Sequence, residues 1–463
     1  MTETARTTFP PQSLEAKDLK HLLHPATNLK QHQAEGPVVY ARGKGVYVWD
    51  TLGKQYLEGM SGLWCTALGF GEEELVEAAA RQMRTLSYSQ LFGGKANEPS
   101  VLLAEKLTSI APFDAGRVFF GLSGSDANDT QIKLVWYYNN LLGRPKKKKI
   151  ISRMRAYHGV TVATGSLTGI PSFQKHFDLP IPQVLHTDCP HYYRGAKAGE
   201  SEDAFVDRIV GNLEALILVE GPETVGAFIA EPVMGAGGVV VPPAGYFAKV
   251  QALLAKHDIL FIDDEVITGF GRTGNPFGAQ TFGIKPSTMT VAKGLSSGYL
   301  PISAVLIPES MYEPMVDASS DVGMFGHGFT YSGHPVCAAV ALRNIELMEE
   351  RNIFAHAVAM GKIFQERLHA FGEHPLVGET RGVGLIGAVE LVADKLTKRT
   401  FPAEKKVAPY LHKRCAANGV ILRSLGDSIV FCPPLIITPD QIDELFTKFE
   451  KSLNETRDWV SAG

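Results

Sequence analysis

The sequence predicts an α/β fold with a large, doubly wound domain, and two observations support this prediction. Short apolar runs alternate with helical patterns between about residues 115 and 310, as expected for a sheet covered by helices on both faces. Two of these short apolar runs, Ile259–Ile262 and Met289–Ala292, are typical of buried parallel strands. The alternation ends near residue 335, so we expect a second unit after it.

Ahead of the α/β region, a polar stretch carries one short helical pattern at residues 13–23. Strands are then expected at 38–40, 46–49 and 55–57, joined by turns in a small antiparallel meander. Helical patterns at 72–86 and 101–110 flank a glycine-containing loop that carries Tyr88 and Phe92. Aromatic residues on such a loop suit the lip of a pocket or a subunit contact.

The α/β region and the unit after it are assigned from the same signals. Further strands of the sheet are expected at 118–120, 150–154, 227–234 and 302–307, and helices from about 126, at 204–218 and at 246–256. Residues 167–199 are expected to be irregular. The later unit has helices at 336–350 and 354–371 and strands at 381–391, 420–423 and 428–432. Thr438, Pro439 and Gln441 predict a capped start for the last helix.

Composition excludes several function classes. The 45 basic and 49 acidic residues give a net charge of −4, so nothing favours binding to nucleic acid or to an anionic membrane. The five cysteines are scattered and form no CxxC pair, which argues against a disulfide framework and against a zinc site. The start of the chain has no apolar signal region and no apolar run approaches 18 residues. We therefore expect a cytoplasmic protein without a metal.

A carboxylate and an amine follow the two short apolar runs Ile259–Ile262 and Met289–Ala292. Asp264 follows the first run and Lys293 the second, and the carboxyl ends of parallel strands meet at one edge of a sheet. A buried carboxylate there is costly unless a cation or a hydrogen-bond donor meets it, and a protonated ring nitrogen about 4 Å away would contribute about 4 kcal/mol at an effective dielectric of 20. A buried amine has a lowered pKa and can condense with a carbonyl. This combination suits pyridoxal 5′-phosphate (PLP), and the alternative is a structural ion pair beside a surface lysine.

Two other strand ends carry candidate binding residues. The strand at 118–120 runs into a Ser/Gly turn and then a helix, so the N–H groups of Gly124 and Ser125 could bind a phosphate. Ser125 could instead be a helix N-cap. Tyr157 and His158 follow the strand at 150–154, where an aromatic ring can lie on a flat ligand. Ordinary packing is the alternative for both.

Five motifs stand in an order that resembles the class III PLP-dependent aminotransferases, over about residues 46–434. They are 123–129, 157–159, 231–238, 264–272 and 292–294. The segments 62–65, 293–301 and 327–335 are most similar to the omega-amine:pyruvate transaminase branch. There are two departures: Leu122 and Asp126 stand where the family often has Asn and Glu.

The resemblance implies a fold-type-I architecture. A large PLP-binding domain would span residues 65–335, and a small α+β domain would combine residues 1–64 with 336–463. Such enzymes are homodimers, in some cases dimers of dimers, with active sites shared between subunits. Lys293 would form the Schiff base, Asp264 would hold the pyridine nitrogen protonated, and Val266 and Tyr157 would cover the two ring faces. The remaining implied cofactor-binding residues are Gly124, Ser125, His158, Glu231 and, from the partner subunit, Thr330.

The implied reaction is a ping-pong transfer of an amino group from a primary amine to a keto acid, with pyruvate as the expected acceptor. Lys293 would also remove the α-proton as a general base. Arg423 is the candidate for the carboxylate of the keto acid, and a surface arginine on an edge strand is its alternative role. Trp64 has the alternative of core packing. The apolar candidates for the substrate pocket are Leu63, Trp64, Phe92, Tyr157 and Ala236.

Other activities fit the same motifs. A diamine or ω-amino acid such as putrescine, β-alanine or 4-aminobutyrate could be the amino donor. Aminomutases and decarboxylating relatives share the lysine and the aspartate. A catalytically silent homologue would not need Asp264, Lys293 and the phosphate turn together, so their presence favours an enzyme.

Overall fold

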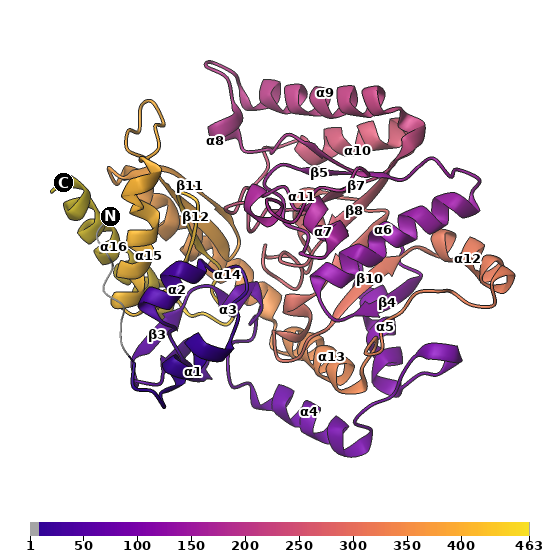
Figure 1. Ribbon diagram of the computed structural model, residues 1–463, viewed down its shortest axis with the longest axis horizontal. Coiled ribbons are helices and arrows are strands. Elements are labelled where there is room, and N and C mark those ends of the chain that lie inside the picture. Colours follow the sequence, from indigo (N-terminus) through magenta and orange to yellow (C-terminus); the bar gives the residue numbers. More distant parts are fainter. Residues whose placement is uncertain (1–8, 463) are drawn as a thin grey trace.

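The computed structural model describes residues 9–462 and is built around one seven-stranded sheet (Figure 1). Its order is β4 (Arg117–Gly121), β10 (Ser303–Ile307), β9 (Thr288–Val291), β8 (Leu260–Asp264), β7 (Val225–Ala230), β5 (Lys149–Arg153) and β6 (Val184–Thr187). β10 runs antiparallel to both of its neighbours, and the other pairs are parallel. The predicted α/β sheet is confirmed, including the parallel pairing of β8 with β9.

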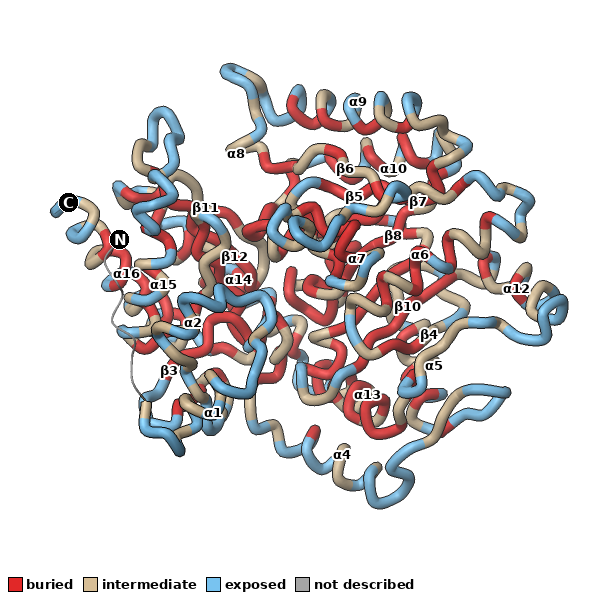
Figure 2. The backbone as a smooth tube through the Cα atoms, viewed as in Figure 1, coloured by how far each residue is buried: buried red, intermediate tan, exposed pale blue. Residues whose placement is uncertain are grey.

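Helices flank this sheet (Figure 1). α6 (Gly124–Leu141) packs across β10, β9, β8, β7 and β4, while α10 (Tyr246–Lys256) contacts β8 and α9 (Glu202–Glu220) contacts β6. The other helices of this part are α4 (Glu73–Thr85), α5 (Glu98–Ile110), α7 (Val162–Leu167), α8 (Tyr192–Gly195), α11 (Gly278–Phe282), α12 (Glu309–Asp321) and α13 (Pro335–Glu350). The strands and the inner faces of the helices are buried (Figure 2), so the ends of the strands have a rigid base.

Two smaller sheets lie beside the large one. One has the order β1 (Tyr40–Lys44), β2 (Tyr47–Asp50), β3 (Gln55–Glu58) and β13 (Val420–Ile421). The other has the order β11 (Val377–Val383), β12 (Ile386–Leu391), β15 (Ser428–Phe431) and β14 (Arg423–Leu425); we call it the C-terminal sheet. Because β13 pairs with β3, the two ends of the sequence meet in one sheet. The predicted domain boundaries at residues 64 and 335 stay predictions.

The helices around the smaller sheets come from both ends of the chain. They are α1 (Leu14–His21), α2 (Leu29–Glu35), α3 (Ser61–Trp64), α14 (Ile353–Ala370), α15 (Val407–Ala417) and α16 (Pro439–Ser461). α16 has the predicted capping box, in which Thr438 accepts from the N–H of Gln441 and the Gln441 side chain accepts from the N–H of Thr438. Within residues 9–462, no helix has the length and apolar character needed to cross a membrane.

Several boundary predictions were wrong. The expected single strand at 381–391 is a hairpin, because Gly384 has a φ of +55° and turns the chain between β11 and β12. The expected strand at 420–423 is two strands: β13 pairs with β3, whereas β14 pairs with β15. The segment 167–199 contains β6 and α8 and is therefore not wholly irregular. α2, α3, α7, α11, α12 and α15 were not predicted.

Candidate active site

The carboxyl ends of β8 and β9 open into a cavity of about 400 Å³. Asp264 is the last residue of β8, and Lys293 follows β9 at the start of a short 3₁₀ turn, with a φ of +46°. That left-handed conformation is uncommon for a residue with a side chain, and such conformations gather at functional sites. The two side chains predicted to face one site therefore line the same cavity.

Asp264 is held by three donors. Its Oδ2 accepts from Asn128 Nδ2 at 2.8 Å and from His158 Nδ1 at 2.7 Å, and its Oδ1 accepts from the N–H of Val266 at 3.1 Å. The carboxylate is 3% exposed, so these bonds fix its orientation at the cavity wall. Because Nδ1 of His158 donates, the ring is oriented as well as the carboxylate.

Lys293 is half-buried, and the removal of its amine from water lowers the amine's pKa, while Cys65 and the carboxyl of Asp264 oppose that shift. A lowered pKa leaves more of the amine neutral at pH 7, which is the form that acts as a nucleophile and as a base. Burial also raises the pKa of Glu231, whose oxygens accept from the N–H groups of Tyr157 and Gly235 at 3.0 Å each. Glu231 thus joins two segments of the cavity wall.

The start of α6 is the part of the cavity where the sequence predicts phosphate binding. Its N-cap is Ser123, and Ser123 with Asp126 forms a capping box, so the alternative that Ser125 is the N-cap was wrong. Asp126 accepts from the N–H groups of Leu122 and Ser123 and from the Ser303 hydroxyl. Although Asp is shorter than the Glu that the family often has here, its carboxylate still caps the N-terminus of α6. The first N–H groups of a helix have no partner inside it, which leaves those of Gly124 and Ser125 able to bind an anion.

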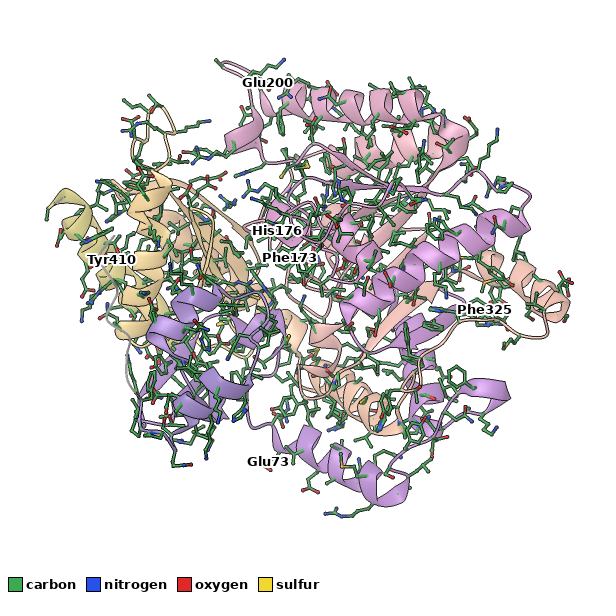
Figure 3. The ribbon with its side chains drawn as sticks, viewed as in Figure 1. Glu73, Phe173, His176, Glu200, Phe325 and Tyr410 are labelled. Atoms are coloured by element: carbon green, nitrogen blue, oxygen red, sulfur yellow. The ribbon has the colours of Figure 1, made fainter. Side chains whose placement is uncertain are left out.

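The cavity fits a flat, positively charged ring with an anionic tail. Among residues 9–462, Nε2 of His158 and Oδ1 of Asn128 are buried polar atoms without a hydrogen-bond partner near Asp264. Val266 and Tyr157 both line the cavity, and Val266 packs against Gly124, where an added Cβ would lie 3.0 Å from it. The Tyr157 ring is held edge-on by Phe173, labelled in Figure 3, with ring centroids 5.4 Å apart.

A model of the family described as aminotransferase class-III matches residues 29–453. The chain belongs to this family. It is therefore a fold-type-I enzyme that uses PLP and transfers amino groups between small amines and keto acids. The cavity residues suit that cofactor: Gly124 and Ser125 at the phosphate, Asp264 at the ring nitrogen, Val266 and Tyr157 at the ring faces, and Lys293 at the aldehyde.

Named relatives of this aminotransferase carry several substrate names. A gamma aminobutyrate transaminase from Solanum lycopersicum is 50% identical over 427 residues, which are 92% of this chain and 82% of that one. A vanillin aminotransferase from Capsicum annuum is 50% identical over 421 residues, 91% and 92% of the two chains. The omega transaminase of Pseudomonas jessenii, solved in complex with PMP, superposes with a TM-score of 0.96 at 51% identity and covers 97% of this chain and 100% of its own.

Four predicted substrate residues of the aminotransferase lie outside the lining of this cavity, whereas Tyr157 is part of it. Trp64 is 4% exposed and packs in an apolar cluster with Met60, Val233 and Ile267, and Ile267 lines the cavity. Leu63 and Phe92 are exposed, and Ala236 is half-buried on the loop after Glu231. None of these four is among the residues that line the cavity in the described part of the chain.

Arg423 and Thr330 also lie outside the cavity lining of residues 9–462. Arg423 begins β14 and is half-buried; burial lowers the pKa of its guanidinium, and Tyr157 lies close enough to oppose that shift. Thr330 is exposed, and its carbonyl accepts from the Tyr88 hydroxyl at 2.9 Å. The loop with Tyr88 thus lies against the segment that carries Thr330.

Some cavity residues escaped prediction. Asn128 lies one helical turn after Gly124, so the i, i+4 spacing of the predicted helix was the signal that could have found it. Cys65 lines the cavity too, and burial raises the pKa of its thiol. No sequence pattern marks Cys65, because its position depends on the fold of the turn at 60–65. The other unpredicted lining residues include Leu122, Ser123, Gly159, Ile267, Ser296 and Gly298.

Proposed function

We propose that this aminotransferase moves the amino group of an apolar primary amine, carried on a terminal or benzylic carbon, to pyruvate by a ping-pong cycle. The observation that carries the proposal is that the half-buried guanidinium of Arg423 lies close enough to Tyr157 for the two to affect each other's pKa, so that a cation and an aromatic ring can share one site. An apolar amine would rest on the ring in one half-reaction, and a keto-acid carboxylate would pair with the guanidinium in the other. Relatives named omega transaminase and vanillin aminotransferase support the amine class.

The chain's residues divide the work as follows. PLP, when bound, supplies an aldehyde that condenses with amines and a ring that accepts the electron pair left by the departing proton. Lys293, whose burial favours its neutral form, would take the α-proton of the substrate and return a proton to the carbon of the cofactor's aldehyde group. Asp264, fixed by Asn128 and His158, keeps a proton on the ring nitrogen. The N–H groups at the start of α6 hold the phosphate.

A second candidate is an ω-amino acid donor such as 4-aminobutyrate. The relatives named gamma aminobutyrate transaminase favour it, and Arg423 could bind the distant carboxylate of such a donor. The two candidate functions predict different kinetics for the variant Arg423→Ala. With a benzylic amine as donor, Arg423→Ala should raise the KM for pyruvate at least about tenfold, the loss of one charge-assisted bond, and leave the amine KM nearly unchanged.

With 4-aminobutyrate as donor, Arg423→Ala should raise both KM values. Arg423→Lys is the matched control because it keeps the charge and loses the bidentate geometry, so its effect should be smaller. Steady-state kinetics of the three proteins with both donors makes the test. Unchanged KM for pyruvate in Arg423→Ala would refute the role of Arg423 and the proposed acceptor site.

We also propose a homodimer in which the partner subunit's Thr330 completes each phosphate site. Thr330 is exposed and held by Tyr88, on a loop that packs closely against the same segment: an added Cβ on Gly328 would lie 2.5 Å from the Phe92 ring. Light scattering should give twice the chain mass of 50.3 kDa. Thr330→Val, which removes only the hydroxyl, should weaken PLP retention; a fully retained cofactor would contradict the shared site.

A further inference from the structure

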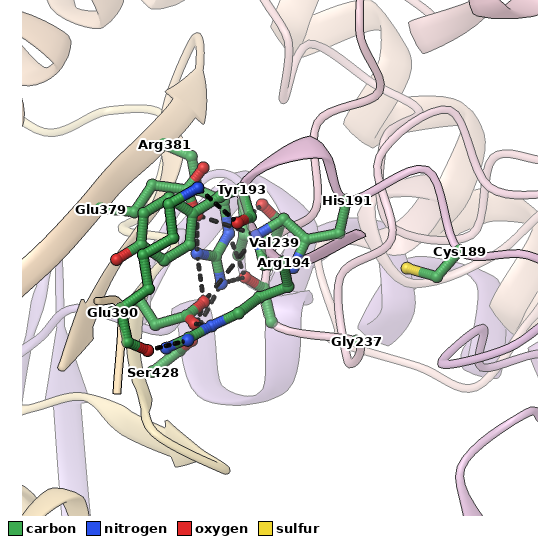
Figure 4. A network of polar contacts seen from close by, with 12 residues as sticks. Cys189, His191, Tyr193, Arg194, Gly237, Val239, Glu379, Arg381, Glu390 and Ser428 are labelled. Carbon is green, nitrogen blue, oxygen red and sulfur yellow. Dashed lines mark hydrogen bonds and ion pairs between the residues drawn. The ribbon is translucent and has the colours of Figure 1, made fainter. Parts of the chain in front are cut away.

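A buried network of charged groups joins the C-terminal sheet to the wall of the active site (Figure 4). Arg381 on β11 donates to Glu379 at 2.6 Å, to Glu390 at 2.7 Å and to the carbonyl of Gly238 at 2.6 Å. His191 stands on the other side of the same carboxylates, with Nε2 2.8 Å from Glu379. The partners come from segments nearly 190 residues apart, so the network fixes two parts of the molecule against each other.

Arg155 extends this network to the turn that carries Tyr157. Its Nη1 lies 3.0 Å from Nδ1 of His191, and its Nη2 donates to the carbonyl of Gly237 at 2.6 Å. Glu231 ties the same two segments from inside through the N–H groups of Tyr157 and Gly235. The turn with Tyr157 and the loop at 235–238 are therefore joined at two points, one of which depends on Arg155.

The close fit explains the glycines of that loop. A Cβ on Gly237 would lie 2.6 Å from the carbonyl oxygen of Arg155. On Gly238, whose φ is +104°, a Cβ would lie 3.2 Å from the guanidinium groups of both Arg155 and Arg381. Side chains here would push the two arginines away from the loop. The loop is thus shaped to be held by both.

The protonation state of His191 follows from its partners. A guanidinium has only donors, so Nδ1 of His191 must accept from Arg155 and carry no proton. Nε2 then carries the proton and donates to Glu379. The imidazole is neutral, and burial lowers its pKa while Glu379 opposes that shift. The other charged or titratable groups that face it are Glu390, Arg381, Arg194, Tyr193 and Cys189.

The same groups are not arranged as a metal site. His191, Glu379 and Glu390 offer three ligand atoms within 4.8 Å of one another. Arg381, however, already pairs with both carboxylates, and a divalent cation would have to displace a buried guanidinium. The cluster is therefore complete without a metal.

We propose that His191 is a positioning residue whose neutral ring, as the link between Arg155 and Glu379, holds the C-terminal sheet in place against the Tyr157 turn. Glu379, Arg381 and Glu390 lie on β11 and β12, and Arg423 begins β14 of the same sheet. The network therefore sets the position of Arg423 relative to the Tyr157 ring. Resting on the proposed function, the inference is that the protonation state of His191 controls binding of the keto-acid carboxylate.

Protonation of His191 replaces its only acceptor with a donor. The contact with Arg155 then becomes repulsive, while the contact with Glu379 remains. Arg155 moves away from His191, and the loop at 235–238 loses the hydrogen bond from Arg155 to the carbonyl of Gly237. If the protein binds the keto acid only when His191 is neutral, the apparent KM for the keto acid rises about tenfold for each pH unit below the pKa of His191.

Two variants separate the two contacts. His191→Asn places an amide oxygen near the position of Nδ1, and so keeps an acceptor for Arg155. His191→Gln places its amide near Nε2, and so keeps a donor for Glu379 but loses that acceptor. We would measure KM for pyruvate and for a benzylic amine from pH 5 to pH 8, and use the wild type to subtract titrations that all three proteins share.

The expected result is a KM ratio, pyruvate over amine, that rises in the wild type toward the acid end of this range, because burial places the pKa of His191 below its ordinary value. The ratio should stay low and flat in His191→Asn and be raised about tenfold and flat in His191→Gln. Parallel pH profiles in all three proteins would overturn the proposal. A His191→Gln protein with the wild-type ratio at pH 8 would overturn it as well.

Hydrogen exchange supplies a readout that needs neither cofactor nor turnover. After correction for the intrinsic pH dependence, amides at 235–239 should exchange faster in the wild type at pH 5 than at pH 8. In His191→Gln they should exchange fast at both values; equal protection in both proteins at both pH values would refute the coupling. If Arg423→Ala leaves KM for pyruvate unchanged while this exchange pattern appears, the acceptor assignment fails and the role of His191 in positioning the loop stands.

Discussion

Glu58 gives a prediction that tests whether its buried carboxyl holds the turn at residues 60–65 in place. Its carboxyl is buried at the end of β3 and accepts from the N–H groups of Met60 and Gly62, the start of the turn that carries Leu63 and Trp64. Burial raises its pKa from 4.5 to about 7, although Arg272 and the two N–H groups oppose the shift. The native state therefore binds a proton between these two pKa values that the unfolded state has released.

The sign of the pH effect follows from that proton. The stability contributed by protonated Glu58 is fully present below pH 4.5 and is lost as the pH rises to about 7. The loss amounts to about 3 kcal/mol, since one pKa unit corresponds to about 1.4 kcal/mol. Glu58→Gln cannot ionise and should not show this loss. Its amide nitrogen will face one of the two N–H donors, so at pH 5 the variant should be less stable by about 1–3 kcal/mol.

The assay is thermal unfolding of both proteins at half-unit steps from pH 5 to pH 8. Between pH 5 and pH 8 the stability difference should shift by about 2.5 kcal/mol against the wild type, or roughly 3 °C for a chain of this length, so that Glu58→Gln becomes at least about as stable as the wild type at pH 8. Glu58→Ala removes both acceptors and should be worse at every pH, so it serves as a control for the turn. A difference between wild type and Glu58→Gln that stays constant from pH 5 to pH 8 would refute the buried, protonated carboxyl.

Three other changes test the site and the core. Lys293→Ala should lose the protein-linked imine absorbance that the wild type shows with PLP, and the band in the wild type should bleach with amine and return with pyruvate; a wild-type band that no amine changes would contradict transamination. Asp264→Asn should lower kcat about 10²- to 10³-fold, the scale of one lost electrostatic contact, in single-donor kinetics. Asp263→Asn is its matched control, because burial and the neighbouring Glu265 raise the pKa of Asp263 well above its usual range and keep it neutral, so kcat should hardly change. Phe446→Ala, in the core of α16, should cost about 3–5 kcal/mol in chemical unfolding, and a loss below 1 kcal/mol would mean that the core there is not as packed as the structure has it.

The large sheet was predictable because its signals are local. Short, largely apolar runs mark β8 and β9, and the residues at their ends, Asp264 and Lys293, are brought to one cavity by the parallel pairing. Asn128 was within reach of the same reasoning, through its spacing from Gly124. These residues need no information beyond their own strand or helix and the rule that strand ends meet.

The smaller sheets were less predictable, because the choice of partner strand is not local. Val420–Arg423 has the pattern of one strand, yet Ile421 pairs with Glu58 in one sheet and Arg423 with Val430 in another. Trp64 shows the same limit: its sequence context suits a pocket wall or a core, and only packing against residues more than 150 positions away puts it in the core. The pairing of His191 with Glu379 likewise leaves no mark on either segment.

The residues proposed for chemistry and the residue proposed for specificity therefore belong to different parts of the fold. Lys293, Asp264 and the start of α6 are fixed by the large sheet, which every transamination needs in the same form. Arg423 belongs to the C-terminal sheet, and its distance from Tyr157 depends on the contacts between that sheet and the large one. Relatives about 50% identical carry the names of different substrates, an amino acid in one case and an aldehyde in another, within the same family. This division would explain why substrates differ within one family. Substitutions in the contacts between the C-terminal sheet and the large sheet, such as those of Arg155 and His191, can move Arg423 without changing Lys293 or Asp264.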